Sequence, residues 1–370
     1  MKLKIPDYLS AIKAYVPGKP IEEVQREYGI DDSIKLASNE NPLGPSPMAL
    51  AAIRQVIENL HRYPDAAGYE LTQSIARKYN IDSPSIVLGN GSDDIISLLT
   101  VVLLRPGDEV ILPQPSFLFY EISIRSSGAL PVWVPLKSFK TDLAGMIQKI
   151  NPKTRMIFLN VPHNPTGAII SKSDFEDFIA AIPPRIVTVL DEAYIEFVKD
   201  LNCVNSFNYL KADKPVVGMR TFSKAYGLAG LRVGYGVMPG ALAELLNRVR
   251  QPFNVNSLAQ VAAAAALNDD PFLQKTVDLV HTELEFIYAA LHRLGVAFIR
   301  SEANFFMVEV ADGKTADDVF EELLKLGIIV RSMASYGYPR HIRVTIGKHE
   351  DNVRFLEALE KVLSHPASGH

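Results

Sequence analysis

Short apolar runs alternate with longer amphipathic segments from residue 86 onward, and this alternation constrains the fold most strongly. Residues 155–160 and 186–190 carry continuous apolar runs, which are typical of strands buried on both faces of a parallel sheet. The segment between them, 171–182, has its apolar residues at helical spacing. Strand, helix and strand in this order predict an α/β fold, in which helices cover both faces of a mainly parallel sheet.

The same alternation extends on either side of this unit. Further strands are expected at 86–88, 109–112, 130–134 and 216–220, and helices at 94–104 and 117–127. After residue 271 the pattern changes to that of a smaller α+β domain. Its expected elements are helices at 272–294, 315–326 and 351–363 and strands at 305–310, 328–331 and 342–346.

The length of 370 residues predicts two domains, because single domains usually run to roughly 50–250 residues. The large domain is expected at 36–268 and the small domain at 269–370. The first 35 residues are too short to fold alone and contain three prolines. We expect segment 1–35 to be an arm that contributes to the small domain and to the substrate pocket.

Composition excludes several classes of protein. Hydrophobic residues make up 48% and charged residues 22%, as in globular proteins, and the net charge of −4 argues against nucleic acid as a partner. One cysteine, Cys203, cannot form a disulfide within the chain or a cysteine-rich zinc site, so we expect no metal. No stretch resembles a signal peptide or a membrane helix, which predicts a cytoplasmic protein that does not bind membranes.

Lys224 is the strongest chemical candidate in the sequence. It follows Ser223 and precedes Arg232 by eight residues, with glycine, alanine and leucine between them. Poor solvation disfavours a charged lysine, and a neutral lysine can form a Schiff base. An arginine supplies a fixed positive charge for a phosphate. The aldehyde and the phosphate of pyridoxal phosphate need both groups, although a solvated surface lysine is the plainer alternative.

Three further polar segments follow predicted strands, where open α/β sheets bind ligands. The loop 89–94 contains Ser92 and Asp93 and could present helix N–H groups to a phosphate, or could be an ordinary capped turn. Asn164 lies in the turn His-Asn-Pro-Thr-Gly and could donate to a ring oxygen. Asp191 could pair with a protonated pyridine nitrogen, and Tyr194 could bind the ring oxygen, or Asp191 could merely cap a turn.

With this order of motifs, the chain resembles the fold type I pyridoxal-phosphate aminotransferases from Ser38 to Gly347. The resemblance implies a large domain with a seven-stranded, mainly parallel sheet and a smaller α+β domain. It implies that Lys224 bonds the cofactor aldehyde and that Asp191 holds the pyridine nitrogen. It also implies a set of cofactor contacts at Ser92, Asp93, Phe117, Asn164, Tyr194, Ser223 and Arg232.

Within this superfamily, the chain is similar to the histidinol-phosphate aminotransferases, a group of the class II aminotransferases. The segments that carry this similarity are 15–20, 38–44, 62–65, 191–197, 327–331 and 342–345. The resemblance implies transfer of the amino group of L-histidinol phosphate to 2-oxoglutarate, giving imidazole acetol phosphate and L-glutamate in histidine biosynthesis. It also implies a homodimer with shared active sites.

Four residues outside the cofactor set receive roles from this resemblance. Tyr63 is implied to reach the cofactor phosphate of the partner subunit, and Tyr15 to close the substrate pocket. Arg343 is implied to bind the glutamate carboxylate in one half-reaction and the substrate phosphate in the other, with Arg331 as a second phosphate contact. Taken alone, the two arginines could equally form surface ion pairs, which contribute about 0–1 kcal/mol.

The chain departs from the family pattern at Phe117, where a tyrosine usually stacks on the cofactor ring. An aromatic amino acid aminotransferase remains an alternative, because loss of the phosphate requirement needs few changes on the same scaffold, and a threonine-phosphate decarboxylase is another. A DNA-binding regulator would need an additional module, for which the chain has no room before residue 35. A dehydrogenase is disfavoured because no Gly-x-Gly-x-x-Gly segment opens a helix after a strand.

Overall fold

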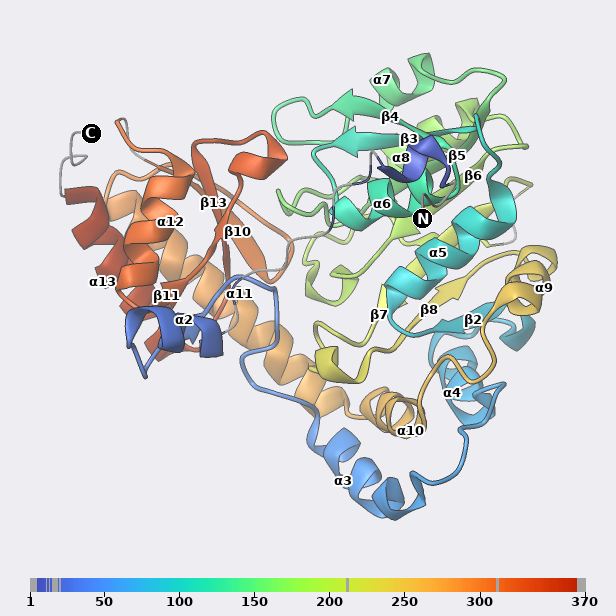
Figure 1. Ribbon diagram of the computed structural model, residues 1–370, viewed down its shortest axis with the longest axis horizontal. Helices are drawn as coiled ribbons and strands as arrows, with labels where there is room; N and C mark the ends of the chain where they lie inside the picture. Colours follow the sequence, from blue (N-terminus) through green and yellow to red (C-terminus); the bar gives the residue numbers. More distant parts are fainter. Residues whose placement is uncertain are drawn as a thin grey trace.

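A seven-stranded sheet forms the centre of the larger lobe in the computed structural model, which describes residues 5–10, 12, 14, 19, 21–210, 213–310 and 313–364 (Figure 1). The strand order is β2-β8-β7-β6-β5-β3-β4. β8 runs antiparallel to both of its neighbours, and the other pairs are parallel. The strands are β2 (Ile86–Gly89), β3 (Glu109–Gln114), β4 (Leu130–Pro135), β5 (Thr154–Asn160), β6 (Val187–Asp191), β7 (Val216–Thr221) and β8 (Gly234–Val237). The predicted mainly parallel sheet is confirmed.

Helices cover both faces of this sheet because its central strands are apolar on both sides. On β5, Met156 and Phe158 pack toward one helical layer, and Ile157 and Leu159 pack toward the other. The first layer contains α5 (Ser92–Leu103), α6 (Leu118–Ser126) and α9 (Gly240–Val249). The other side is covered by α3 (Pro47–Val56), α4 (Tyr69–Tyr79), α7 (Leu143–Gln148), α8 (Lys172–Ala181) and α10 (Ser257–Ala266).

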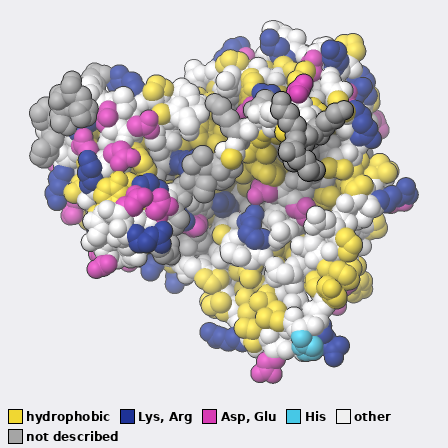
Figure 2. Space-filling view, viewed as in Figure 1, with side chains coloured by type: hydrophobic (Ala, Val, Ile, Leu, Met, Phe, Trp, Pro, Cys, Tyr) yellow, Lys and Arg dark blue, Asp and Glu magenta, His cyan; other side chains and the backbone are white. Residues whose placement is uncertain are grey.

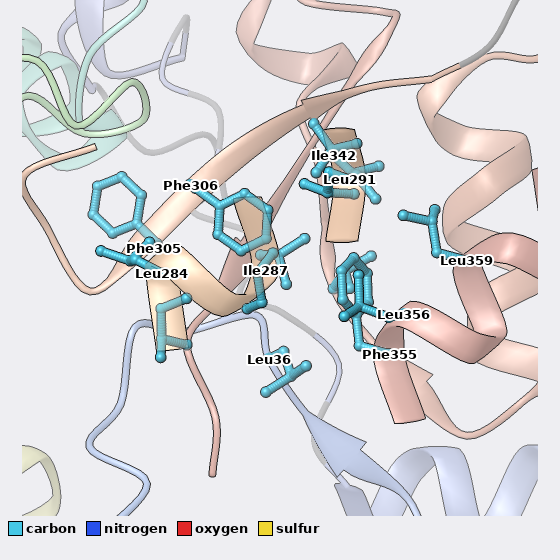
Figure 3. Packing of buried hydrophobic residues seen from close by; sticks show 14 of the residues in the cluster. Leu36, Leu284, Ile287, Leu291, Phe305, Phe306, Ile342, Phe355, Leu356 and Leu359 are labelled. Atoms are coloured by element: carbon cyan, nitrogen blue, oxygen red, sulfur yellow. The ribbon is translucent and has the colours of Figure 1, made fainter. Parts of the chain in front are cut away.

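The smaller lobe is built on a four-stranded sheet with the order β12-β13-β10-β9. Its elements are α11 (Asp270–Arg293), β9 (Phe298–Ile299), β10 (Phe305–Glu309), α12 (Ala316–Lys325), β12 (Arg331–Ser332), β13 (His341–Thr345) and α13 (His349–Ser364). Figure 3 shows how side chains of α11, β10 and α13 meet in its core, with Phe305, Phe306 and Phe355 among them. The core is apolar because α11 and α13 each turn one hydrophobic stripe toward the sheet.

The N-terminal segment contacts both lobes. Its elements are α1 (Asp7–Ser10), α2 (Ile21–Tyr28) and β1 (Ile34–Lys35). α1 contacts α6 of the larger lobe, whereas α2 and β1 pack on the smaller lobe. Val24 of α2 is fully buried in a cluster with Leu324 and Ile329, and Figure 1 shows α2 beside β11 (Ile328–Ile329). β1 pairs with β11 in parallel. The boundaries expected at residues 35 and 268 stay a prediction.

The strand expected at 328–331 is two strands in the structure. β11 pairs with β1, whereas β12 pairs with β13 in the other sheet. The chain changes sheets at Val330, which is buried between the two strands. A continuous apolar run does not reveal this change of sheet, because Ile328, Ile329 and Val330 are all buried whichever sheet they join.

Among the helices described, no stretch combines the length and the apolar character that crossing a bilayer requires. Some large apolar side chains remain exposed on helices, strands and loops. Figure 2 shows hydrophobic side chains gathered at the lower end of this face, in the part of the molecule that α3 occupies. Exposed apolar residues in and after α3 include Met48, Leu50, Ile57, Leu60 and Tyr63.

Candidate active site

A cavity of about 220 Å³ lies where the central strands end. Asn160, Asp191 and Thr221, the last residues of β5, β6 and β7, all line it. Parallel strands place their carboxyl ends at one edge of a sheet, which is why residues far apart in sequence meet there. Nine of the residues singled out in the sequence line this cavity: Ser92, Asp93, Phe117, Asn164, Asp191, Tyr194, Ser223, Lys224 and Arg232.

Lys224 extends its amine into the cavity from the loop that follows β7. Its Nζ donates a hydrogen bond to the carbonyl oxygen of Ser38 at 3.1 Å. Burial and the nearby Arg343 guanidinium lower the pKa of Lys224 from its ordinary value of 10.5 to about 8. A lysine in this environment is partly neutral near neutral pH, as a nucleophilic amine must be.

Asp191 ends β6 with a buried carboxylate. Its Oδ1 accepts the backbone N–H of Ala193 at 3.2 Å, and its Oδ2 accepts a hydrogen bond from the Tyr120 hydroxyl. Burial raises the pKa of Asp191 to about 6, and the hydrogen bond from Tyr120 opposes that rise. The carboxylate therefore remains mainly ionised at neutral pH and can hold a cationic N–H that faces the cavity.

One end of the cavity is built to receive an anion. Ser92 and Asp93 begin α5, whose first N–H groups have no partner within the helix. Arg232 donates to Ser223 Oγ at 3.4 Å and to Asp93 Oδ2 at 3.2 Å. Arg232 has a left-handed backbone with φ +56°, a strained conformation that often marks a functional position. A helix N-terminus, a hydroxyl and a guanidinium together suit a phosphate.

Two glycines make room for this anion site. A Cβ on Gly91 would lie 2.5 Å from Arg232 Nη2, and one on Gly234 would lie 2.6 Å from the backbone nitrogen of Ser92. Gly91 also has φ +85°, which other residues rarely adopt. The close approach of backbone and guanidinium therefore depends on the absence of side chains at both positions.

Asn164 and Tyr194 form the polar wall beside Asp191. Asn164 Nδ2 donates to the Tyr194 hydroxyl at 3.4 Å, and Asn39 Nδ2 donates to the same oxygen at 2.9 Å. Burial raises the pKa of Tyr194 to about 12, so its hydroxyl stays protonated. Arg343 donates from Nη1 to Asn164 Oδ1 at 2.6 Å, which connects the smaller lobe to the cavity wall.

Arg331 and Arg343 lie directly opposite each other on the antiparallel strands β12 and β13. Arg343 is buried, and its Nη2 also donates to the Ala37 carbonyl oxygen at 2.8 Å. Residues directly opposite each other in an antiparallel pair have their side chains on the same face of the sheet, so both guanidinium groups lie on one side of it. The pair therefore adds a second cationic region next to the cavity wall.

Tyr63 lies away from this cavity. The Tyr63 side chain is 83% exposed, does not line the cavity and stacks on Phe253 with ring centroids 4.7 Å apart. Tyr15 lies outside the described residues, so its predicted role in the substrate pocket stays a prediction.

Sequence reasoning missed several residues that the structure brings to the cavity. Tyr120 bonds Asp191, Asn39 bonds Tyr194, and Glu40 lines the cavity while pairing with Lys35 at 3.0 Å. Tyr120 follows Phe117 by three residues, the spacing that places side chains on one helix face. The spacing from Phe117 could therefore have placed Tyr120 near the cavity. Asn39 and Glu40 lie in a loop, where no periodicity indicates the direction of a side chain.

A larger cavity of about 430 Å³ lies elsewhere, beside Phe197, Leu284 and Tyr288. None of the nine predicted residues lines it. Its polar groups include the exposed pair Arg300 and Glu285, whose side chains approach to 2.7 Å. The smaller cavity is the candidate active site, because its ionisable side chains converge, whereas the larger cavity is distinguished only by its volume.

Comparison with known proteins places this geometry in a family. The family model for aminotransferase class I and II matches residues 31–359. The histidinol-phosphate aminotransferase of Moorella thermoacetica is 43% identical over 362 residues, covering 98% of this chain and 93% of the relative. The histidinol-phosphate aminotransferase 2 of Carboxydothermus hydrogenoformans is 45% identical, covering 96% of this chain and 98% of the relative.

Solved structures give the same result for the fold. Histidinol-phosphate aminotransferase from Sinorhizobium meliloti, in complex with pyridoxal-5'-phosphate, superposes with a TM-score of 0.89 at 26% identity and covers 98% of both chains. A double mutant of Thermus thermophilus aspartate aminotransferase superposes with a TM-score of 0.85 at 21% identity, which shows the shared fold alone. It covers 98% of this chain and 100% of the mutant chain.

Proposed function

The chain belongs to the class I and II aminotransferase family, and we propose that it transfers the amino group of L-histidinol phosphate to 2-oxoglutarate. The products are imidazole acetol phosphate and L-glutamate, and the reaction is a step of histidine biosynthesis. The relatives named for this substrate match almost the full chain. The observation that carries the proposal to this chain is the Arg331–Arg343 pair, since both substrates are anions.

Pyridoxal phosphate is the cofactor, and the residues of the cavity fit it. We assign its phosphate to the start of α5 and to Ser223 and Arg232, where Gly91 leaves the necessary space. Asp191 holds the ring nitrogen, Phe117 stacks on the ring, and the Asn164–Tyr194 wall binds the ring oxygen. When bound, the cofactor supplies the aldehyde that accepts the amino group and the ring that stores an electron pair.

Lys224 moves the proton in this proposal. Its Nζ, with a pKa of about 8, would take the proton from the substrate α-carbon and hold it for return to the cofactor carbon that bears the amino group. Asp191 remains a carboxylate and keeps the ring nitrogen protonated, which favours storage of the electron pair on the ring. Both residues are fixed at the ends of neighbouring strands, so neither needs to move far during the reaction.

Arg343 serves two anions in turn. Its planar guanidinium can bind the carboxylate of glutamate or the phosphate of histidinol phosphate with paired hydrogen bonds. Arg331, opposite it on β12, adds a second positive charge for the doubly charged phosphate. We therefore expect phosphate recognition to need both arginines, whereas carboxylate recognition depends mainly on Arg343.

We also propose a homodimer with shared active sites. Tyr63 lies within the exposed apolar surface of Met48, Leu50, Ile57 and Leu60, and such surfaces mark protein interfaces. Because Tyr63 does not line the cavity of its own chain, we assign it to the cofactor phosphate bound in the partner subunit. We also propose a cytoplasmic location for the enzyme.

Substrate preference tests this function. We expect kcat/KM for L-histidinol phosphate to exceed that for L-phenylalanine by at least about 100-fold, since losing hydrogen bonds to a charged phosphate costs several kcal/mol. The assay follows 2-oxoglutarate-dependent formation of glutamate by the purified holoenzyme. Preference for phenylalanine would instead identify an aromatic amino acid aminotransferase. Release of carbon dioxide without 2-oxoglutarate would identify a decarboxylase.

A further inference from the structure

Tyr120 contacts Asp191, a residue of the proposed catalytic machinery. It lies on α6 and is fully buried, and its hydroxyl donates a hydrogen bond to Asp191 Oδ2. Burial, and the neighbouring Asp191 carboxylate, raise the pKa of Tyr120 well above its usual value. The phenol therefore stays protonated and acts as a permanent donor toward the carboxylate.

Aromatic neighbours hold the Tyr120 ring in this orientation. It stacks on Phe158 of β5, with centroids 4.5 Å apart and planes 11° from parallel. It also meets the cavity-lining Phe117 edge-on, with centroids 5.6 Å apart and planes at 89°. The ring is thus packed against the strand next to β6 and against the side chain assigned to the cofactor ring, so its hydroxyl has little freedom to leave Asp191.

We propose that Tyr120 is a positioning residue for the aminotransferase reaction, which keeps Asp191 a carboxylate so that the proton stays on the cofactor ring nitrogen. Asp191 accepts hydrogen bonds from Tyr120 and Ala193, and it lines the cavity that we assign to the cofactor ring. A hydrogen bond to the charged form of a carboxylate stabilises that form. Without the Tyr120 donor, Asp191 is a stronger base and draws the shared proton away from the ring.

The inference also accounts for the departure at Phe117. The phenylalanine keeps the stacking surface but has no hydroxyl. A phenol is present three residues later, at Tyr120, where its hydroxyl donates to the Asp191 carboxylate. The side chain at 117 therefore supplies stacking, and the side chain at 120 supplies the polar contact.

The ring nitrogen can be observed directly. The test uses Tyr120→Phe holoenzyme loaded with pyridoxal phosphate that carries nitrogen-15 in the ring, and the nitrogen chemical shift reports protonation. We expect a smaller protonated fraction in Tyr120→Phe than in the wild-type enzyme at the same pH. An unchanged nitrogen shift would overturn the proposal. This readout needs no substrate, so it stands apart from the proposed preference for histidinol phosphate.

Kinetics give a second readout. We expect kcat of Tyr120→Phe to fall by about tenfold to a hundredfold with KM nearly unchanged, the size of effect expected for one hydrogen bond to a charged group. Tyr209→Phe is the matched control: its hydroxyl donates to the Glu176 carboxylate at 3.3 Å, its ring meets Phe175 edge-on, and it does not line the cavity. Both the nitrogen shift and kcat should match the wild type in that control.

A double-mutant cycle separates this role from a structural one. If Tyr120 acts through Asp191, adding Tyr120→Phe to an Asp191→Asn protein should lower kcat by less than about twofold, because partners in one network are not additive. Full additivity of the two losses would mean that Tyr120 only packs α6 against β5, and would overturn the proposal. Thermal unfolding of each apoprotein checks that the proteins compared are folded.

Discussion

At the scale of single residues, the active site depends on groups whose charge is set by burial. Lys224 loses part of its affinity for a proton, and Asp191 gains some, because both lie in a cavity with little water. Arg343 reinforces the effect on Lys224 and also fixes Asn164. These shifts leave a partly neutral amine and a carboxylate within one site, the combination that proton transfer at an α-carbon requires.

The pKa of Lys224 predicts how the apoprotein captures its cofactor. Only the neutral amine attacks the aldehyde, so the capture rate should rise about tenfold per pH unit below pH 8 and then level off. An ordinary lysine would still be gaining neutral amine near pH 10. Stopped-flow absorbance of apoprotein mixed with pyridoxal phosphate measures this rate across the pH range.

Arg343→Gln provides the control for this pH dependence. The substitution removes a positive charge that lowers the pKa of Lys224. The pH at which the capture rate levels off should therefore increase. A capture rate that keeps rising to pH 10 in the wild-type protein would contradict the account of Lys224.

Much of the residue-level site could be predicted from sequence because each residue follows a strand. Asp191 directly ends β6, and the Lys224 loop follows β7, so strand ends alone bring them together. The contact between Arg343 and Asn164 could not be predicted in this way. It joins two lobes across 179 positions of sequence, and it depends on how β13 packs beside the cavity.

At the scale of elements, two loops meet at the site that we assign to the cofactor phosphate. The loop from β2 to α5 and the loop from β7 to β8 converge, and Arg232 bridges them through Asp93 and Ser223. Within the large sheet, β8 is the strand that the sequence pattern did not predict, because Gly-Tyr-Gly-Val resembles a turn. Gly234 is required there since a side chain would meet the start of α5.

Gly91→Ala tests the anion site. The new Cβ would lie 2.5 Å from Arg232 Nη2, so we expect the dissociation constant for pyridoxal phosphate to rise at least about tenfold, the equivalent of 1.4 kcal/mol. Gly107→Ala is the matched control, because Gly107 has a similar φ of +88° with nothing within 4 Å of its Cβ.

Both glycine variants should lose about 1 kcal/mol of stability from the positive φ, and only Gly91→Ala should lose cofactor affinity. Titration of each apoprotein with pyridoxal phosphate, beside a denaturant melt, measures the two effects separately. Equal affinities for pyridoxal phosphate in the two variants would mean that the start of α5 does not bind the cofactor phosphate.

At the scale of the whole molecule, both lobes contribute to the site, and in the proposed homodimer a partner subunit would complete it. The smaller lobe supplies Arg331 and Arg343, and the larger lobe supplies the cavity. The lobes also meet where the Glu302 backbone N–H donates to the Gly167 carbonyl oxygen at 3.0 Å, close to the Asn164 turn. The order of strands and helices in the sequence predicts each lobe separately. It does not show how the surface of one lobe packs against the other.

Complementation between two inactive proteins tests whether Tyr63 acts across subunits. Tyr63→Ala and Lys224→Ala subunits, unfolded together and refolded, should form heterodimers in which one site has both defects and the other has neither. Each heterodimer should then show about half of the wild-type kcat per dimer, as expected for one intact site of two.

The alternative arrangement gives a different result. If Tyr63 acts within its own chain, neither site of the heterodimer is intact, and activity stays at the level of the Tyr63→Ala protein. Mixing without unfolding is the control, because subunits that do not exchange cannot complement.

A single-turnover measurement tests most directly the claim that Lys224 moves the proton in transamination of histidinol phosphate. Wild-type and Lys224→Ala proteins, both loaded with pyridoxal phosphate, are mixed with L-histidinol phosphate while the cofactor absorbance is followed. Lys78→Ala removes an ion pair with Asp270 and a hydrogen bond to the Leu267 carbonyl oxygen, both away from the cavity, and serves as the control. We predict that Lys224→Ala is slower by at least about 10³-fold, within the range of general acid–base catalysis. Conversion at the wild-type rate in Lys224→Ala would contradict the account.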